Sequence, residues 1–316
     1  MKKVVFLDTV HPVLSEKLRK NGFECLDASL LSKEMCLNEI KSAVGIVIRS
    51  RFKVDFDFLK EAFNIEFIAR SGSGMENIDV NYCKENGISV FNSPEGNRNA
   101  VGEHCVGFLL NLMNNISKGN HEVKSGVWDR EGNRGEELSG KTVAIIGYGH
   151  NGRAFAEKLK GFNVNIIAYD KYKKGFSDGH VKEVSLEEIF ELAHVVSFHI
   201  PQNKETSDFA NQSFFKKFNH PIYILNISRG KIINTEDLVS AIDLNLIKGA
   251  ALDVLEYEPS SFEPFLEIIP ENLYNKIKKT NQIILTPHVA GWTKESYYKL
   301  SNVLANKVLN HYKNED

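Results

Sequence analysis

Three side chains suited to acid–base chemistry follow short apolar runs of the sequence: Arg229, Glu258 and His288. Each run has the length and composition of a buried strand. An imidazole can exchange a hydroxyl proton near neutral pH, a carboxylate can orient it, and a guanidinium can hold a substrate carboxylate in a planar fork. This set suits a reaction in which a carbinol carbon loses a hydride while its hydroxyl loses a proton. Taken singly, the arginine also fits a surface residue, and the histidine also fits a core or surface histidine.

A glycine-rich turn indicates the hydride carrier. It follows the apolar run 143–146 and precedes a helical pattern over 153–161, which is the context that G-x-G-x-x-G requires. The first glycine allows the tight turn, the second lets the backbone approach a pyrophosphate, and the third permits close helix–strand packing. Free N–H groups at the helix start would then bind phosphates, and a plain turn is the alternative. The predicted cofactor contacts in the turn are Gly147, Tyr148, Gly149, His150, Asn151 and Gly152.

Asp170 decides which dinucleotide is expected. It lies 18 residues after Gly152, at the end of the next predicted strand. A carboxylate there can accept hydrogen bonds from both ribose hydroxyls and would repel a 2′-phosphate, so NAD is expected. Lys171, Lys173 and Lys174 leave NADP open, because a cation can pair with that phosphate. A solvated strand end is the alternative for Asp170.

These residues need strands to position them, and the sequence alternates strand and helix patterns along its length. The chain has 316 residues, which suggests two domains at roughly 150 residues each. Alternation of this kind predicts βαβ units on parallel sheets. In the first part we expect strands at 4–7, 45–48, 66–69 and 89–91, with helices at 12–21 and 79–86. In the second we expect strands at 143–146, 164–169, 195–198, 222–226, 249–252 and 283–285.

Two helix starts are recognisable in the second part. Ser185 and Glu188 form the pattern of a capping box that opens a helix reaching Ala193. Glu236 and Asp237 place acidic residues in the first turn of another helix, which suits its dipole.

Composition excludes several classes of protein. The formal net charge is −2, so no basic face for nucleic acid is expected. There is no apolar run of about 18 residues, so no membrane span is expected, and acidic residues interrupt the N-terminus too early for a signal peptide. The four cysteines are not spaced as C-x-x-C, which predicts no metal site and no disulfide framework. We expect a soluble cytoplasmic protein with reduced core thiols.

Taken together, the motifs GYGHNGR, NISRG, GAALDVLEYEP and TPHVAG resemble those of the D-isomer-specific 2-hydroxyacid dehydrogenases, in order and over nearly the whole chain. The resemblance implies that Arg229 binds the substrate carboxylate and carbonyl, and that Glu258 pairs with His288, the acid–base residue. It implies that Asp253 holds the nicotinamide end of NAD. Pro201 and Ser228 are also predicted to contact the cofactor.

The resemblance further implies an α/β fold with two Rossmann-like domains. Residues 98–291 would form a doubly wound, parallel-sheet NAD domain. Residues 1–97 and 292–316 would form a smaller, discontinuous, flavodoxin-like substrate domain, with crossings near Asn97 and Gly291. On composition the segment 92–97 is the domain boundary, and an internal surface turn is the alternative. The substrate is expected in the cleft between the domains, with hinge closure excluding water.

Two segments of the smaller domain bear on the substrate, a 2-hydroxy or 2-oxo acid. Ser73 and Gly74 belong to a glycine-rich loop whose N–H groups can bind a carboxylate, with a bland turn as the alternative. Arg49 and Arg51 resemble the cationic segment of the D-3-phosphoglycerate dehydrogenases of the family, where arginines face the phosphate. Solvated arginines at a strand end are the alternative. We therefore expect 3-phosphoglycerate and its oxo acid as substrates.

Two departures favour a different short 2-oxo acid, such as hydroxypyruvate or glyoxylate. The chain ends at Asp316, so we expect no appended regulatory domain and no serine-type feedback. Trp292 is bulky and follows the His288 segment, where it could narrow the pocket or shield it from water. The sequence does not fix the physiological direction, and it gives residues 260–282 no role.

Other classes remain open. A non-catalytic NAD-sensing protein of the same fold is one alternative to an enzyme. A formate dehydrogenase of the same superfamily is another, although Glu258 argues against it. Residues 101–116 are apolar beyond one helical face, and the resemblance places this helix at a homodimer interface, with a buried intrachain helix as the alternative.

Overall fold

The computed structural model describes residues 2–258 and 269–313, and the chain divides into two compact units. Unit 1 comprises Met1–Arg98 and Trp292–Asp316, and unit 2 comprises Asn99–Gly291. Both borders fall within one residue of the crossings expected at Asn97 and Gly291.

Unit 1 is built on a parallel sheet of five strands in the order β2-β1-β3-β4-β5. This is the flavodoxin-like order, and it confirms the predicted fold class. Strand β2 was not predicted, because its sequence F-E-C-L-D carries acidic residues at an edge position that is mostly part-exposed. The strands are β1 (Lys2–Phe6), β2 (Phe23–Asp27), β3 (Gly45–Ile48), β4 (Phe67–Arg70) and β5 (Ser89–Asn92).

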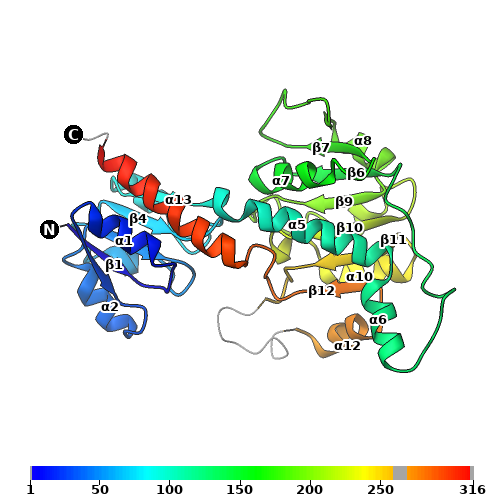
Figure 1. Ribbon diagram of the computed structural model, residues 1–316, viewed down its shortest axis with the longest axis horizontal. Helices are drawn as coiled ribbons and strands as arrows, with labels where there is room; N and C mark the ends of the chain where they lie inside the picture. The colour runs from blue at the N-terminus through cyan, green and yellow to red at the C-terminus, as the bar shows by residue number, and fades with distance from the viewer. Residues whose placement is uncertain (1, 259–268, 314–316) are drawn as a thin grey trace. The chain divides into compact units, whose positions relative to one another are not determined.

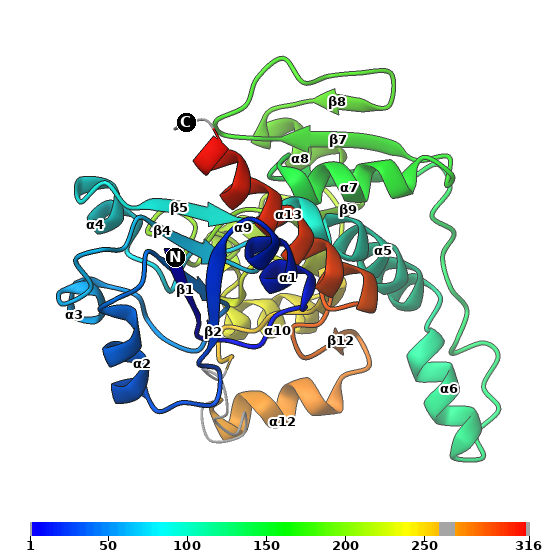
Figure 2. The same cartoon turned by 60° about the vertical axis from the view of Figure 1, so that its left-hand side comes forward.

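Helices cover both faces of this sheet. On one face, α1 (Val13–Lys20) and α13 (Lys294–Lys313) lie side by side, as Figures 1 and 2 show. Leu14, Leu18 and Leu304 pack there against Val4 and Phe67. The other face is covered by α2 (Lys33–Ile40), α3 (Phe56–Leu59) and α4 (Val80–Glu85).

Unit 2 is built on a parallel sheet of seven strands in the order β12-β11-β10-β9-β6-β7-β8. The doubly wound order confirms the second part of the fold prediction. Only β8, a short edge strand, was not predicted. The strands are β6 (Thr142–Ile146), β7 (Asn165–Tyr169), β8 (Val181–Glu183), β9 (Val195–Phe198), β10 (Ile222–Asn226), β11 (Ile247–Leu252) and β12 (Ile283–Leu285).

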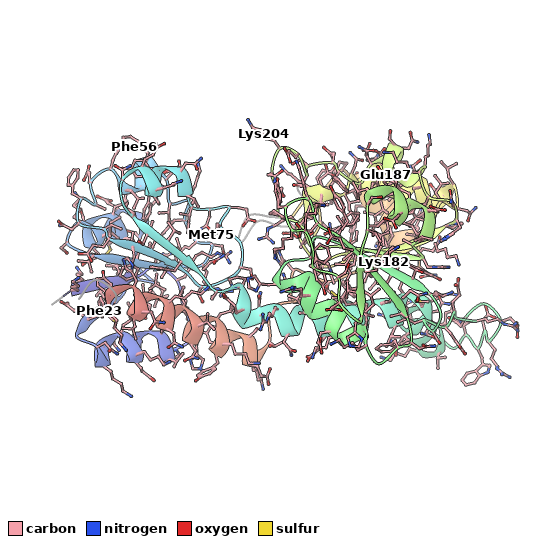
Figure 3. The ribbon with its side chains drawn as sticks, turned by 90° about the horizontal axis from the view of Figure 1, so that it is seen from above. Phe23, Phe56, Met75, Lys182, Glu187 and Lys204 are labelled. Atoms are coloured by element: carbon pink, nitrogen blue, oxygen red, sulfur yellow. The ribbon has the colours of Figure 1, made fainter. Side chains whose placement is uncertain are left out.

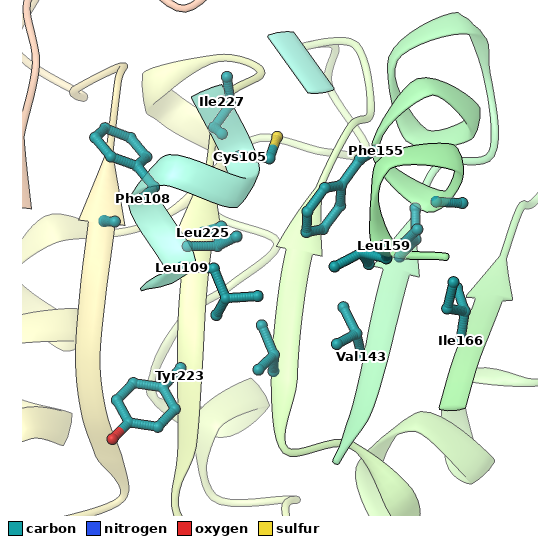
Figure 4. Packing of buried hydrophobic residues seen from close by; sticks show 14 of the residues in the cluster. Cys105, Phe108, Leu109, Val143, Phe155, Leu159, Ile166, Tyr223, Leu225 and Ile227 are labelled. Atoms are coloured by element: carbon teal, nitrogen blue, oxygen red, sulfur yellow. The ribbon is translucent and has the colours of Figure 1, made fainter. Parts of the chain in front are cut away.

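The central strands β6, β9 and β10 of unit 2 are buried on both faces, as is typical of parallel sheets. Figure 4 shows Phe108 and Leu109 of α5 (Pro94–Met113), with Phe155 and Leu159 of α7 (His150–Leu159), packed over the sheet. The opposite face carries α8 (Leu186–Leu192), α9 (Gln212–Phe215) and α10 (Thr235–Asp243). Helix α12 (Glu271–Lys279) packs its Leu273 and Ile277 against Val239 of α10, which gives a structural role to part of the unassigned stretch. Residues 260–268 of that stretch lie outside the described residues.

Helix α5 carries the chain from one unit to the other. The segment 92–97 was predicted to be the domain boundary, with an internal surface turn as the alternative, and α5 begins within it at Pro94 and continues through the unit border at Arg98. Proline is well suited to the first turn of a helix, where its missing N–H has no helical partner. The crossing is therefore helical at this point.

The apolar residues of α5 pack in the hydrophobic core of this chain. Phe108, Leu109 and Met113 are buried against the sheet of unit 2, as the intrachain alternative predicted. Exposed apolar side chains lie farther along, on α6 (Ile116–Lys124) and the segment after it. These are Ile116, Val123, Val127 and Trp128, with exposed fractions of 56%, 53%, 47% and 78%.

Across the described part of the chain, no helix combines the length and apolarity needed to cross a membrane.

The predicted capping box opens α8. The Ser185 hydroxyl accepts a hydrogen bond from the Glu188 N–H, and the Glu188 carboxylate accepts one from the Ser185 N–H. Glu187 on the same helix and Lys182 on β8 are exposed and are labelled in Figure 3.

Removal of this cap tests the local account. Ser185→Ala leaves an N–H at the helix start without its acceptor, so we expect the unfolding free energy to fall by about 0.5–2 kcal/mol in urea denaturation. Ser185→Asp keeps an acceptor and serves as the matched control. Equal stability of the alanine and wild-type proteins would show that the cap contributes nothing.

Candidate active site

The carboxyl ends of β6 and β9 flank the crevice where the strand order of unit 2 reverses. The chain runs from β6 through β7 to β8 on one side, and returns through β9 on the other. Ligands of doubly wound sheets bind at such a switch point. A pocket of about 390 Å³ lies here, lined by Gly147, Gly149, Asp170, His199 and Pro201 among others.

The glycine-rich turn forms one wall of this pocket. Gly147 has φ +96°, and a Cβ on it would lie 2.6 Å from the His199 carbonyl oxygen, so a side chain is excluded. A Cβ on Gly149 would meet no atom within 4 Å, which leaves its backbone open to a ligand. Helix α7 starts at His150, the next residue. The buried Asn151 Oδ1 has no hydrogen-bond partner among the described residues. A helix start, open space beside the Gly149 backbone and a buried polar atom fit a dinucleotide phosphate.

Asp170 has a structural role that the sequence did not reveal. Its Oδ2 accepts the Tyr148 N–H at 2.9 Å, and its Oδ1 accepts the N–H groups of Tyr172 at 2.9 Å and Lys173 at 3.0 Å. A carboxylate has about four acceptor positions, so the expected ribose contact would use the remaining one. The Tyr148 ring is buried and stacks on Phe176, and Tyr148 is not among the residues that line the pocket.

The lysines beside Asp170 have partners within the chain. Lys171 pairs with Glu205, Lys173 Nζ donates to the Tyr148 carbonyl, and Lys174 Nζ donates to the Asp170 carbonyl. Each ammonium group is therefore held by a neighbour, which weakens the case for binding a 2′-phosphate.

The remaining predicted cofactor residues lie at strand ends. Pro201 lines the pocket, and its carbonyl accepts the Thr206 hydroxyl at 2.6 Å. Ser228 is buried and its hydroxyl donates to Asn226 Oδ1 at 2.8 Å. His199, which the sequence analysis missed, bonds Ser197 through Nε2, and burial lowers its pKa to about 3. It is therefore a neutral imidazole at neutral pH.

Strands β10, β11 and β12 are neighbours, and the three catalytic candidates follow their carboxyl ends. His288 Nδ1 lies 3.0 Å from Glu258 Oε2, while Glu258 Oε1 accepts the Leu255 N–H at 2.9 Å. Arg229 is close enough for its charge to oppose protonation of His288. The structure thus brings together three residues that are far apart in the sequence.

The turn carrying Arg229 is fixed by Asn226, a second residue that the sequence analysis did not single out. The buried Asn226 side chain donates to the Arg229 carbonyl at 2.9 Å and accepts from the Ser228 N–H and hydroxyl. A Cβ on Gly230 would lie 1.8 Å from the Leu255 carbonyl oxygen. Glycine therefore lets this turn lie directly against the segment that carries Glu258.

Asp253 holds the segment that carries His288. Its Oδ1 accepts the Thr286 hydroxyl at 2.5 Å and the Val289 N–H at 2.8 Å, while its Oδ2 accepts the Ala290 N–H at 2.8 Å. The His288 N–H donates to the Asp253 carbonyl at 2.8 Å. His288 has φ +53°, a left-handed conformation that is unusual for a residue other than glycine. Asp253 therefore stabilises an unfavourable backbone at the acid–base candidate.

His104 of α5 extends this network. Its Nε2 lies 3.2 Å from the Thr286 hydroxyl and 3.9 Å from Asp253 Oδ1. Burial lowers its pKa, and the Asp253 charge opposes that effect. No sequence signal identified His104, because it lies within an apolar helical run far from Asp253 in the chain.

Comparison with known proteins identifies the family of the chain. The model of the D-isomer specific 2-hydroxyacid dehydrogenase NAD-binding domain matches residues 106–290, which lie within unit 2. The chain belongs to the D-isomer specific 2-hydroxyacid dehydrogenase family. Unit 2 is its NAD-binding domain.

Relatives within the family differ in substrate. D-3-phosphoglycerate dehydrogenase of Archaeoglobus fulgidus is 32% identical over 98% of this chain and 57% of its own length, so the chain spans just over half of that relative. Hydroxypyruvate reductase of Thermotoga maritima is 31% identical over 88% of both chains.

Solved structures of the family share the fold. D-2-hydroxyisocaproate dehydrogenase superposes with a TM-score of 0.86 at 22% identity, covering 100% of this chain and 98% of its own. D-lactate dehydrogenase of Aquifex aeolicus, solved with NAD and lactic acid, gives 0.82 at 24% identity, covering 99% and 96%. At these identities the likeness shows the fold alone.

The four predicted substrate residues lie in unit 1. Ser73 and Gly74 follow β4, and the Ser73 hydroxyl donates to Asn97 Oδ1 at 2.8 Å. Arg49 follows β3, the strand that pairs with β4 in the sheet. Its guanidinium carbon lies 4.2 Å from the centre of the Trp292 ring.

Arg51 corrects the prediction of a two-arginine phosphate site. Its Nη1 donates to the carbonyls of Leu7 at 3.1 Å and Ala28 at 3.0 Å, and its Nη2 donates to that of Leu31 at 2.5 Å. A guanidinium bonded to three backbone carbonyls holds the fold of unit 1 rather than a substrate. Arg49 alone is left for that role.

The His288–Glu258 pair has a measurable electrostatic signature. The hydrogen bond with Glu258 raises the pKa of His288 above its ordinary value near 6.5, and burial opposes this effect. A raised folded-state pKa stabilises the fold fully below pH about 6.5, and this contribution is lost as the pH rises through the raised value.

We therefore expect Glu258→Gln to lower the pKa of His288, measured from its imidazole resonance by NMR titration. His288→Gln identifies the resonance. Glu256→Gln is the matched control, because the Glu256 carboxylate instead accepts the Thr235 N–H. An unchanged His288 pKa in Glu258→Gln would contradict the pairing.

Proposed function

We propose that this chain is an NAD-dependent D-2-hydroxyacid dehydrogenase that interconverts a D-2-hydroxy acid and its 2-oxo acid. The observation that carries the proposal is the His288–Glu258 pair beside Arg229. The pair lies at the carboxyl edge of the same sheet whose strand β6 leads into the glycine-rich turn. A protein that only senses NAD has no need of an imidazole with a carboxylate partner, so the pair favours an enzyme.

The proton moves through His288. Its Nδ1 faces Glu258, so Nε2 is the atom that exchanges a proton with the substrate oxygen. In the reductive direction the imidazolium donates that proton to the oxo group, and Glu258 stabilises the charged form beforehand. Arg229 would bind the substrate carboxylate as a planar fork and polarise the adjacent oxo group.

The residues of the pocket fit the cofactor. Residues 147–152 would bind the pyrophosphate, Asp170 the ribose, and Pro201 the adenosine end, with Asp253 and Ser228 toward the nicotinamide end. When bound, NAD supplies the hydride acceptor, and NADH supplies the donor. We expect NAD rather than NADP, because the Asp170 carboxylate would repel a 2′-phosphate.

For the substrate we propose 3-phosphoglycerate and 3-phosphohydroxypyruvate, with the phosphate bound by Arg49 and the carboxylate by the loop of Ser73 and Gly74. The Archaeoglobus fulgidus relative supports this choice. Hydroxypyruvate is the second candidate, supported by the Thermotoga maritima relative, which matches this chain over most of both lengths.

We also propose a cytoplasmic homodimer. All four cysteines are free, which suits a reducing compartment. The exposed apolar side chains of Ile116, Val123, Val127 and Trp128 form a patch that a second copy of the chain would cover. A monomeric mass in sedimentation at micromolar concentration would contradict the dimer.

Turnover with NADH tests the proposed activity. We expect reduction of 3-phosphohydroxypyruvate, hydroxypyruvate or glyoxylate, and we expect His288→Gln to lower kcat by about 10²–10⁴-fold because the proton donor is lost. His180→Gln, at an exposed position in unit 2, is the control. NADH binding measured by fluorescence should survive in His288→Gln. Binding of NADH without turnover of any 2-oxo acid would favour a sensor instead.

A further inference from the structure

We infer that Trp292 is a positioning residue, whose ring holds the Arg49 guanidinium as the recognition site for a second anionic group on the substrate, a phosphate remote from the reacting carbon. This inference rests on the proposed function and deepens it by naming what selects a phosphorylated 2-oxo acid. It is carried by the surroundings of Arg49 within unit 1.

Arg49 lies where a doubly wound sheet places ligands. In unit 1 the strand order reverses between β1 and β3. Asp8 comes two residues after the end of β1, and Arg49 directly follows β3. The carboxyl ends of the two strands at such a switch point flank the ligand crevice.

The backbone at Arg49 is fixed by the carboxylate of Asp8. Asp8 Oδ2 accepts the N–H groups of Arg49 at 2.7 Å, Ser50 at 3.0 Å and Arg51 at 3.1 Å. Consecutive N–H groups in this arrangement bind an anion, and here the anion is the chain's own carboxylate. The Arg49 side chain therefore starts from a rigid position.

The planar face of the Arg49 guanidinium stacks on the Trp292 ring, whereas its edge carries the N–H donors. Its carbon lies 4.2 Å from the centre of the Trp292 ring, a cation–π distance. Among the described residues, no acceptor or carboxylate bonds the Arg49 guanidinium, in contrast to Arg51 with its three carbonyls. Stacking leaves the in-plane N–H donors open, and these match the oxygens of a phosphate in a bidentate contact.

Trp292 is supported in turn by other aromatic rings. Its ring lies edge-on to Tyr297 at 5.5 Å between centres, and Tyr297 lies edge-on to His11 at 5.4 Å. Trp292 is 48% exposed, so packing in a hydrophobic core does not by itself explain a tryptophan at this position. The contact with Arg49 adds a specific role to the expectation that Trp292 narrows the pocket or shields it from water.

The test compares two substrates with the same carbon skeleton, 3-phosphohydroxypyruvate and hydroxypyruvate. In Trp292→Leu we expect the ratio of their kcat/KM values to fall about three- to thirty-fold, the range expected for a cation–π contact. The loss should come from the KM of the phosphorylated substrate. Trp292→Phe keeps a ring face and should restore part of the ratio. Phe63→Leu, at an 88% exposed aromatic residue of the same unit, is the control.

A double-mutant cycle identifies the mechanism. If the ring acts through Arg49, Trp292→Leu has no further effect on the ratio in an Arg49→Met background. Equal loss for both substrates, or an undiminished Trp292→Leu effect in that background, would overturn the inference. Selective loss for 2-oxoglutarate, with none for the phosphorylated acid, would overturn the phosphate assignment.

A second measurement does not depend on turnover. The chain has two tryptophans, so in Trp128→Phe the emission reports Trp292. We expect inorganic phosphate to change this emission saturably, and Arg49→Met to abolish the change. An absent change in full-length, folded Trp128→Phe protein overturns the inference, whereas absent turnover with an intact emission change overturns only the proposed function.

Discussion

The buried carboxylate of Asp253 is the interaction on which the candidate site depends. Three donors surround it, one hydroxyl and two backbone N–H groups, and all three belong to the segment on either side of His288. A buried charge is costly unless it is fully hydrogen-bonded, so this set of donors is strongly specified. The same contacts hold His288 in a left-handed conformation, which places its Nδ1 opposite Glu258.

The same device recurs at other strand ends. Asp8 after β1 accepts three consecutive N–H groups, and Asp170 after β7 accepts three from the glycine-rich turn and its own loop. In each case a carboxylate at the carboxyl edge of a sheet fixes the loop from which a ligand contact is proposed. Charge-assisted hydrogen bonds to backbone are short and directional, so they fix loops more rigidly than packing alone. The parallel sheets thus provide the scaffold, and the aspartates provide the local precision.

Much of this was predictable because strong periodic signals dominate the sequence. The central strands are continuous apolar runs, and several predicted bounds agree with the structure, such as those of β3, β9, β10 and β12. The edge strands β2 and β8 were missed because part-exposed strands carry charges and lose the apolar signal. Arg229, Glu258 and His288 were found from their places after strands and from the family motifs. The roles of Asn226 and Asp253 in fixing loops were not predicted, because hydrogen bonds between a side chain and the backbone leave no pattern in the sequence. His104 was not predicted, because it contacts Asp253 from about 150 residues away in the chain. The stacking of Trp292 on Arg49 was missed for the same reason.

The central claim is that Asp253 holds the His288 segment, and amide hydrogen exchange tests it most directly. In Asp253→Leu, which keeps the branched shape of the side chain but has no acceptor, we predict that the Val289 and Ala290 amides exchange roughly ten- to a hundred-fold faster, as expected for lost charge-assisted hydrogen bonds. Asp253→Asn should give an intermediate effect, while the amides of Ala250 and Ala251 within β11 keep their protection. Unchanged exchange at Val289 and Ala290, or an equal increase throughout β11, would contradict the account.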